Sequence, residues 1–203
     1  NASDLHVVGR MLTREELLGA SPAPAEGSPA PGGLFVVGSH VAKTTAQLNR
    51  LLDDERVRPL EFEVAQAAAG RGEALADRLA AEVSGRLAAG ETVAVYTSRR
   101  LLTAGTGSPE DDLALSVGVS RALVRMVSGL SVRPRFLVAK GGITSSDIGV
   151  RALGVRRATV LGQALPGVPV WQLGPESRFP GMAYVVFPGN VGDEDALRTL
   201  WNR

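Results

Sequence analysis

The stretch Phe136-Leu-Val-Ala-Lys-Gly-Gly-Ile-Thr-Ser-Ser-Asp147 decides how the rest of the chain is organised. It opens with an apolar run that suits a buried strand, turns at Gly141-Gly142, and continues into hydroxyl-rich residues that suit a helix start. Glycines let a ligand approach the backbone, and the first N–H groups of a helix have no intrahelical partner. The helix dipole adds partial positive charge there, and Lys140 can add a full charge. The stretch therefore predicts an anion site, which we interpret as a site for the phosphates of a nucleotide.

Apolar runs and helical periodicities alternate along most of the chain. Strands are expected at 34–37, 57–64, 92–96, 135–139, 158–161, 168–173 and 182–187. Helices are expected after a cap at Thr44 or Thr45, at 72–89, at 111–128 as a buried helix, beyond Gly142, and from Asp193. This alternation predicts an α/β fold, a three-layer α/β/α sandwich around a mostly parallel sheet. The last three strands have no helices between them, which predicts an antiparallel edge.

The first 33 residues differ in composition from the rest. A short strand at 5–8 and a short helix at 13–18, capped by Thr13 with Glu16 three residues later, precede a segment from Ala20 to Gly33 that is dense in proline and glycine. Such a segment is typical of a linker. We therefore expect residues 1–33 to be an N-terminal segment with a linker, and residues 34–203 to be one nucleotide-binding domain. The chain begins with Asn1 rather than Met, which leaves two alternatives open, a fragment excised from a longer protein and a natural stand-alone protein.

Composition excludes several classes of protein. The 203 residues contain no cysteine, which excludes disulfides, zinc–thiolate sites and iron–sulfur clusters, and only two histidines, which excludes histidine-rich metal sites. No apolar run approaches the roughly 20 residues of a membrane span, and no signal peptide is visible, so we expect a cytoplasmic protein without a membrane partner. The net charge of +1 gives no basic excess, so no nucleic-acid partner is expected.

Polar residues gather where four of the expected strands end. These clusters are Gly38-Ser39-His40, Thr97-Ser98-Arg99-Arg100, Lys140-Gly-Gly-Ile-Thr144 and Pro188-Gly-Asn-Val-Gly192. In open parallel sheets ligands bind beyond the carboxyl ends of the strands, at a topological switch point. Four clusters on one edge of a sheet therefore favour a ligand site there.

Each cluster also has a simpler structural interpretation. Gly141-Gly142 can be a tight turn before a helix cap, Arg99 a salt-bridged surface residue, and Lys140 a strand-end lysine that reaches solvent. His40 is better explained as a loop histidine than as a catalytic base, because no carboxylate is paired with it in sequence. Acidic residues 193–195 are expected in the first turn of the last helix, where they would repel phosphate. We therefore expect adenine or ribose near Gly189-Asn190 and the phosphates nearer Gly142.

The common nucleotide and hydrolase signatures are missing. The chain has no G-x-x-x-x-G-K-S/T loop, no G-x-G-x-x-G fingerprint, no H-E-x-x-H and no G-x-S-x-G elbow. A dinucleotide-dependent oxidoreductase is therefore disfavoured, and a nucleotide must be bound through a less common motif.

The polar clusters together resemble a known family. Its matching segments are Gly38-Ser39-His40-Val-Ala-Lys-Thr44-Thr-Ala-Gln47-Leu48, Tyr96-Thr-Ser-Arg99, Lys140-Gly-Gly-Ile-Thr-Ser-Ser-Asp147, Gly174-Pro-Glu176 and Phe187-Pro-Gly-Asn-Val-Gly-Asp193. From Leu34 onward, the chain is similar to the C-terminal, nucleotide-binding domain of the four-carbon acid sugar kinases. Many members carry Glu where Ile143 stands, and Cys-Ser where His40-Val41 stands.

This resemblance implies a site and a function. ATP contacts are implied at Ser39, Gly141, Gly142, Ile143, Thr144 and Gly189. Further candidates for nucleotide contact are Lys140, Ser145, Arg99, Asn190 and Gly192. No catalytic or metal-binding residue is assigned.

The implied protein is an ATP- and Mg²⁺-dependent kinase for threonate, erythronate or 3-oxo-tetronate. Its N-terminal acceptor domain, which carries the catalytic base, is missing here, so the chain alone is expected to be inactive. That domain is the expected partner, and a homodimer is left open. A stand-alone nucleotide-binding regulatory module is the alternative.

Overall fold

The computed structural model describes residues 9–23, 29–99 and 108–202. One seven-stranded sheet has the order β2-β3-β1-β4-β7-β6-β5. Its strands are β1 Leu34–Val37, β2 Val57–Phe62, β3 Thr92–Thr97, β4 Phe136–Lys140, β5 Ala158–Leu165, β6 Val168–Leu173 and β7 Ala183–Phe187. Strand pairs from β2 across to β7 are parallel, whereas β7–β6 and β6–β5 are antiparallel. This confirms the predicted sheet and its antiparallel edge.

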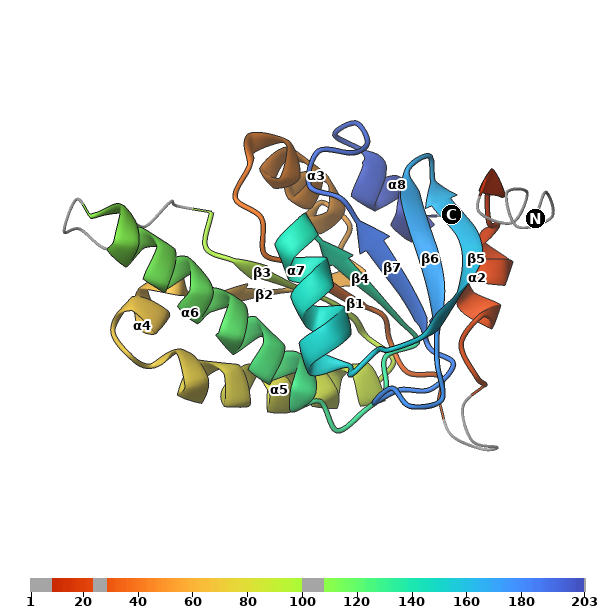
Figure 1. Ribbon diagram of the computed structural model, residues 1–203. Coiled ribbons are helices and arrows are strands. Elements are labelled where there is room, and N and C mark those ends of the chain that lie inside the picture. The colour runs from red at the N-terminus through yellow and green to blue at the C-terminus, as the bar shows by residue number, and fades with distance from the viewer. Residues whose placement is uncertain (1–8, 24–28, 100–107, 203) are drawn as a thin grey trace.

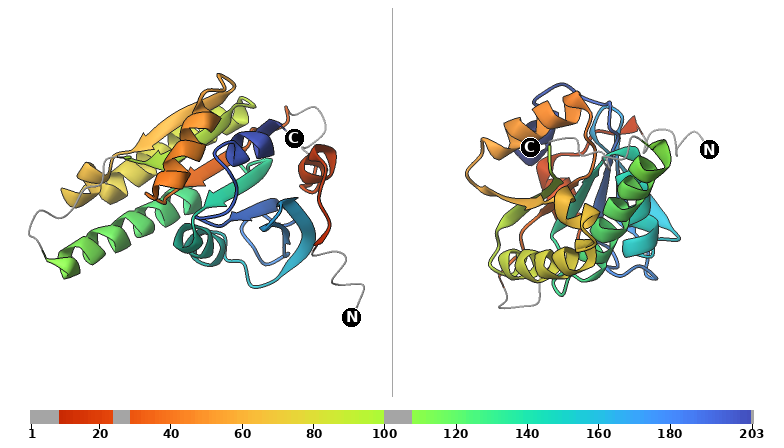
Figure 2. Two further views of the ribbon diagram at one scale, coloured as in Figure 1. Left: turned by 90° about the horizontal axis from the view of Figure 1, so that it is seen from above. Right: turned by 90° about the vertical axis from the view of Figure 1, so that its left-hand side faces the viewer.

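Helices cover both faces of the sheet (Figures 1 and 2). They are α2 Arg14–Gly19, α3 Ala42–Leu52, α4 Val64–Ala68, α5 Gly72–Ala88, α6 Pro109–Ser128, α7 Gly142–Asp147 and α8 Ala196–Asn202. The last turn of α7 continues into a π-helical turn, η1, over Ile148–Ala152. Residues of α4, α5, α6 and η1 pack in the core of one face, and residues of α2, α3 and α8 in the core of the other. The three-layer sandwich is confirmed.

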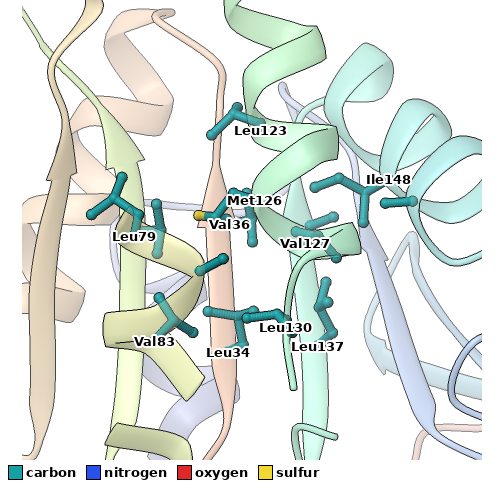
Figure 3. Packing of buried hydrophobic residues seen from close by; sticks show 14 of the residues in the cluster. Leu34, Val36, Leu79, Val83, Leu123, Met126, Val127, Leu130, Leu137 and Ile148 are labelled. Carbon is teal, nitrogen blue, oxygen red and sulfur yellow. The ribbon is translucent and has the colours of Figure 1, made fainter. Parts of the chain in front are cut away.

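Alternating side chains of β1 divide the hydrophobic core in two. Leu34 and Val36 pack with α5 and α6, while Phe35 and Val37 pack with α3 and α8. Figure 3 shows the first of these cores, with Leu79, Met126 and other helix residues packed on one face of the sheet near Leu34, Val36 and Leu137. All four residues of β1 are fully buried, as expected for a central parallel strand. Each face of the sheet therefore has its own hydrophobic core.

The expectation of a buried helix at 111–128 is only half right. α6 begins at Pro109 behind the capping residue Ser108, and its second half is buried against the sheet. Its first half is exposed, with 65% of Leu113 and 43% of Val117 accessible. Figures 1 and 2 show the reason, since the first turns of α6 extend past the helices beside it.

Among the helices of the described ranges, none is long and apolar enough to cross a bilayer.

The N-terminal segment packs on the domain. Thr13 and Glu16 form the predicted capping box at the start of α2. Met11 pairs with Gln163 beside β5, and Leu12 and Leu17 are buried in the core. Residues 9–23 thus protect part of an edge strand. The division at residue 33 stays a prediction, and the strand expected at 5–8 lies outside the described residues.

Three expected boundaries are wrong for local reasons. Val41 is the N-cap of α3, so Thr44 lies inside that helix, where its hydroxyl donates to the Gly189 carbonyl at 3.3 Å. β2 ends at Phe62 rather than at residue 64, because Val64 begins α4. α8 begins at Ala196, because residues 193–195 form a turn in which Asp193 accepts a hydrogen bond from the Asp195 amide. The acidic residues therefore precede α8 instead of lying in its first turn.

Candidate functional site

The candidate site lies where the neighbouring strands β1 and β4 end. β1 leads into α3 on one face of the sheet, and β4 leads into α7 on the opposite face. The two connections diverge, which is the switch-point geometry that forms a crevice in such sheets. A cavity of about 290 Å³ lies there. Its lining includes all six residues for which ATP contact is expected, namely Ser39, Gly141, Gly142, Ile143, Thr144 and Gly189. Their contact with a nucleotide stays a prediction.

The turn between β4 and α7 presents backbone N–H groups to this cavity. Gly141 adopts φ +117°, a conformation that favours glycine, and its own amide donates to the Phe187 carbonyl at 2.9 Å. The first amide with an intrahelical partner is that of Ser145, which donates to the Gly141 carbonyl at 2.9 Å. No side chain caps α7. Within the described residues, the simpler interpretation, a turn with a helix cap, therefore leaves the N–H groups of residues 142–144 without an acceptor.

A close approach between β1 and α7 shapes the cavity floor. A Cβ atom placed on Gly38 would lie 2.3 Å from Thr144 Oγ1, and one placed on Gly141 would lie 3.3 Å from Ser39 Cβ. Glycine at both positions lets the end of β1 and the start of α7 come together. By contrast, a Cβ atom on Gly142 would meet nothing within 4 Å. The space above Gly142 is open to the cavity.

The turn between β7 and α8 forms another wall of the cavity and is held by side chains from α3 and β4. The Gln47 amide donates to the carbonyls of Val191 and Asp193 at 3.0 and 2.6 Å. Lys43 donates to the Asn190 carbonyl at 3.3 Å. These bonds occupy backbone carbonyls of the turn and fix its path past Gly189.

Lys140 braces the same turn instead of reaching solvent or the cavity. Its side chain is fully buried, and its ammonium donates to the carbonyls of Pro188 and Gly189 at 2.7 and 3.1 Å. The ammonium nitrogen also lies 4.1 Å from the centre of the Phe187 ring, a cation–π contact. Burial, helped by the nearby charge of Lys43, lowers the pKa of Lys140 to about 8. The residue is thus a structural clamp between the ends of β4 and β7.

Arg99 performs a similar task at the ends of β1 and β3. Its guanidinium donates to the carbonyls of Ser39 and Thr97 at 2.6 and 2.8 Å, and to the Thr97 hydroxyl at 2.6 Å. Burial lowers the pKa of Arg99. The interpretation of Arg99 as a salt-bridged surface residue is therefore wrong within the described part of the chain. His40 lines the cavity, and burial together with the Arg99 charge lowers the pKa of its imidazole.

α6 supplies a wall of the cavity that the sequence did not indicate. Leu115, Ser116, Val119, Ser120 and Leu123 line it. The hydroxyl of Ser120 donates to the Asp147 carboxylate, which ties α6 to α7. The only signal in the sequence is a pair of serines one turn apart on an apolar helix, which is also typical of an ordinary surface position.

The further candidates for nucleotide contact do not line the cavity between the ends of β1 and β4. Ser145 is buried on the other side of α7, and its carbonyl accepts a hydrogen bond from the Tyr184 hydroxyl at 2.6 Å. Asn190 and Gly192 belong to the braced turn after β7 and do not line this cavity. Within the described ranges, no group of three or more His, Cys, Asp or Glu side chains is arranged to hold a metal ion.

The chain is similar to known proteins in sequence and in fold. The model of a family described as a nucleotide-binding C-terminal domain matches residues 34–197. A 3-oxo-tetronate kinase of Cupriavidus necator is 36% identical over 161 residues, which cover 74% of this chain and 33% of the relative. The chain therefore spans about a third of the length of that relative.

Two solved structures share the fold. A Haemophilus influenzae protein aligns with a TM-score of 0.63 and 19% identity, over 86% of this chain and 40% of its own. A Bordetella bronchiseptica domain of unknown function, with bound citrate and as a domain-swapped dimer, aligns with a TM-score of 0.64 and 21% identity, over 87% of this chain and 43% of its own.

Proposed function

Because the chain belongs to the four-carbon acid sugar kinase family, as its nucleotide-binding C-terminal domain, we propose that the cavity between the ends of β1 and β4 binds ATP. One observation carries this proposal. Six residues from three separate strand ends, for which the family resemblance implies ATP contact, all line the same cavity. They come from three segments that are far apart in the sequence, at residues 39, 141–144 and 189, so their convergence is a property of the fold.

The phosphates would lie over the start of α7. The N–H groups of Gly142, Ile143 and Thr144 have no acceptor among the described residues and can donate to phosphate oxygens, and the helix dipole adds to the attraction. The side chain of Ile143 is 77% exposed, so a backbone contact at this position does not depend on its side chain. This would explain why Ile can stand where many family members carry Glu.

The residues around the cavity suit a nucleotide that binds as its Mg²⁺ complex. Mg²⁺ prefers few protein carboxylates plus substrate phosphates. The described residues around the cavity offer the hydroxyls of Ser39, Thr144 and Ser116 and backbone groups, without a cluster of carboxylates. We therefore expect Mg²⁺ to be held mainly by the ATP phosphates, whose charge it neutralises during phosphoryl transfer.

The acceptor would be bound by a part of the protein that this chain does not contain. The chain spans a third of its kinase relative, and the remainder is the proposed source of the sugar-acid site and of the catalytic base. Threonate, erythronate and 3-oxo-tetronate are the candidate acceptors. We expect the chain alone to be inactive, the protein to act in the cytoplasm, and a homodimer to be a further candidate assembly.

Titration and turnover experiments together test this proposal. Calorimetric titration of the 203-residue chain with Mg–ATP should give saturable binding, with no ATP consumed in the presence of the three acids. The longer protein encoded by the same gene should consume ATP with one of them. Failure of both proteins to bind ATP would overturn the proposal.

A further inference from the structure

A second and larger cavity lies on the other flank of α7. It has a volume of about 590 Å³ and lies between the α7–η1 helix and the strands β5, β6 and β7. Figure 1 shows this part of the sheet beside η1, with no helix drawn across the front of β5 and β6. Its apolar wall consists of Val155, Val160, Trp171 and Val186, with Val150 at the rim. Neither the sequence nor the family resemblance assigns a role to this wall.

The two cavities meet at the first residue of α7. Gly142 lines both of them. The first cavity, at about 290 Å³, is at the lower limit of small-molecule sites, which span roughly 300–1,000 Å³. A nucleoside triphosphate whose phosphates lie over the start of α7 therefore needs room beyond the first cavity, and the adjoining one provides it.

The lining of the second cavity suits a planar aromatic base. Trp171 is half-buried, and its ring lies 6.2 Å from that of Tyr184, which helps to hold it in place. Arg156 is exposed at the cavity, and within the described residues its guanidinium forms no ion pair. Bases stack on indole rings and on guanidinium planes, and valine side chains complete an apolar slot. The exposed Ser146 adds a hydroxyl that can hydrogen-bond to a ribose or a ring nitrogen.

The turn after β7 is less suited to the same role. The carbonyls of residues 188–191 are already bonded to side chains of Lys140, Thr44, Lys43 and Gln47. Asn190 lines neither of the two cavities that share Gly142. The sequence placed adenine or ribose near Gly189-Asn190, whereas the geometry favours the opposite flank of α7.

We propose that the nucleoside part of the nucleotide binds in this second cavity, with the base against Trp171 and the valine wall, while the phosphates cross the start of α7 into the first cavity. The inference rests on the proposed function, because it assumes a nucleotide whose phosphates lie at Gly142. It adds the location of the base and the residues that contact it.

Tryptophan fluorescence gives a direct readout of the base. The chain has two tryptophans, Trp171 and Trp201, and Trp201 lies on α8, where its indole N–H donates to Asp54 at 3.1 Å. In a Trp201→Phe background, Trp171 is the only tryptophan. Mg–ATP should change its emission saturably, at the same concentrations at which calorimetry detects binding. Inorganic tripolyphosphate with Mg²⁺ should bind without this change.

A matched pair of variants separates the base from the phosphates. Val150→Phe fills the rim of the second cavity from a position that is 62% exposed, so folding should be unaffected. Leu113→Phe makes a similar change at a 65% exposed position outside both cavities. We expect Val150→Phe to weaken ATP binding at least tenfold and tripolyphosphate binding less than twofold. Leu113→Phe should change neither.

The outcomes distinguish the two proposals. If tripolyphosphate and ATP bind but Val150→Phe affects them equally, or ATP leaves Trp171 emission unchanged, the base lies elsewhere and only this inference is wrong. If neither ligand binds, the proposed function fails and this inference fails with it.

Discussion

Two glycine-rich turns lie side by side at the carboxyl edge of the sheet and present opposite backbone groups. The turn after β4 leads at Gly141 directly into α7, and the amides of residues 142–144 have no acceptor in the part of the chain that the structure describes. In the neighbouring turn after β7, side-chain donors from Lys140, Thr44, Lys43 and Gln47 occupy the backbone carbonyls. The first turn can therefore attract an anion, and the second serves as a braced wall beside it.

The difference shows that glycine content alone does not identify an anion site. In the sequence, both Gly141-Gly142 and Gly189-Asn-Val-Gly192 are candidates for ligand contact, and the acidic residues 193–195 are the signal that favours phosphate at the first of them. The two turns differ in where the next helix begins. A helix that begins directly after the glycines leaves its first N–H groups without an intrahelical acceptor. A helix that begins several residues later leaves a turn whose carbonyls need hydrogen-bond donors. In this molecule α7 begins at Gly142, whereas α8 begins at Ala196, well after its glycines.

The largest expected effect on stability comes from adding a side chain to the turn between β4 and α7, which we call the open turn. Gly141→Ala places Cβ at φ +117° and 3.3 Å from both Ser39 Cβ and Thr144 Oγ1, which should lower the free energy of unfolding by about 2–3 kcal/mol. Gly189→Ala is the matched change in the braced turn. Its Cβ would have Ser39 Oγ at 3.9 Å as its nearest neighbour, so stability should change by less than about 0.5 kcal/mol. Urea unfolding of both variants would measure the contrast, and equal losses would contradict it.

Removing the clamp should loosen the braced turn and leave the open one folded. Lys140→Met leaves the Pro188 carbonyl without its donor and the Gly189 carbonyl with the Thr44 hydroxyl alone, and should cost about 2 kcal/mol. Lys43→Met, which removes a donor from an exposed lysine, should cost less than about 0.5 kcal/mol. Amide hydrogen exchange should accelerate at residues 189–192 in Lys140→Met and stay unchanged in α7. Faster exchange in α7 alone would contradict the prediction, because it would show that Lys140 supports the turn between β4 and α7 instead of the turn after β7.

A pH dependence of stability follows from the same clamp. Burial places the pKa of Lys140 at about 8 in the folded chain, below its ordinary value of 10.5. Between these values the unfolded chain binds the proton and the folded chain does not, so the free energy of unfolding should rise with pH across this window. Below about pH 8 both states bind the proton, and this contribution to stability is lost. Lys140→Met should remove the rise in urea unfolding between pH 8 and 10.5, and an identical pH profile in both proteins would show that the lysine titrates as in solvent.

The sequence predicted the sheet well because its signals are local. Short apolar runs bounded by glycines and polar residues placed β1 and β6 at their observed bounds and the other strands within a few residues, except for the far end of β5. The same local signals placed the six expected ATP-contact residues at strand ends. Their convergence on one cavity then follows from parallel strands that end at one edge.

What the sequence could not show depends on packing between distant segments. The direction of the Lys140 side chain is set by the carbonyls of Pro188 and Gly189, more than forty residues away. The role of Ser116 and Ser120 as cavity lining depends on how far α6 extends past the helices beside it. The burial of Leu12 and Leu17 in the core could not be predicted from the sequence. The proline-rich segment that follows them is typical of a linker, and it separates them from the strands on which they pack.

The most direct test of an anion site at the open turn compares two substitutions at Gly142. A Cβ atom there would meet nothing within 4 Å, so Gly142→Ala and Gly142→Asp should both fold, as circular dichroism and urea unfolding would verify. We predict that Mg–ATP binds to Gly142→Ala within a few-fold of the parent chain in calorimetric titration. In Gly142→Asp, a carboxylate about 5 Å from a phosphate should lower the affinity on the order of 100-fold. Equal affinity of the two folded variants for Mg–ATP would show that the phosphates do not lie at the start of α7.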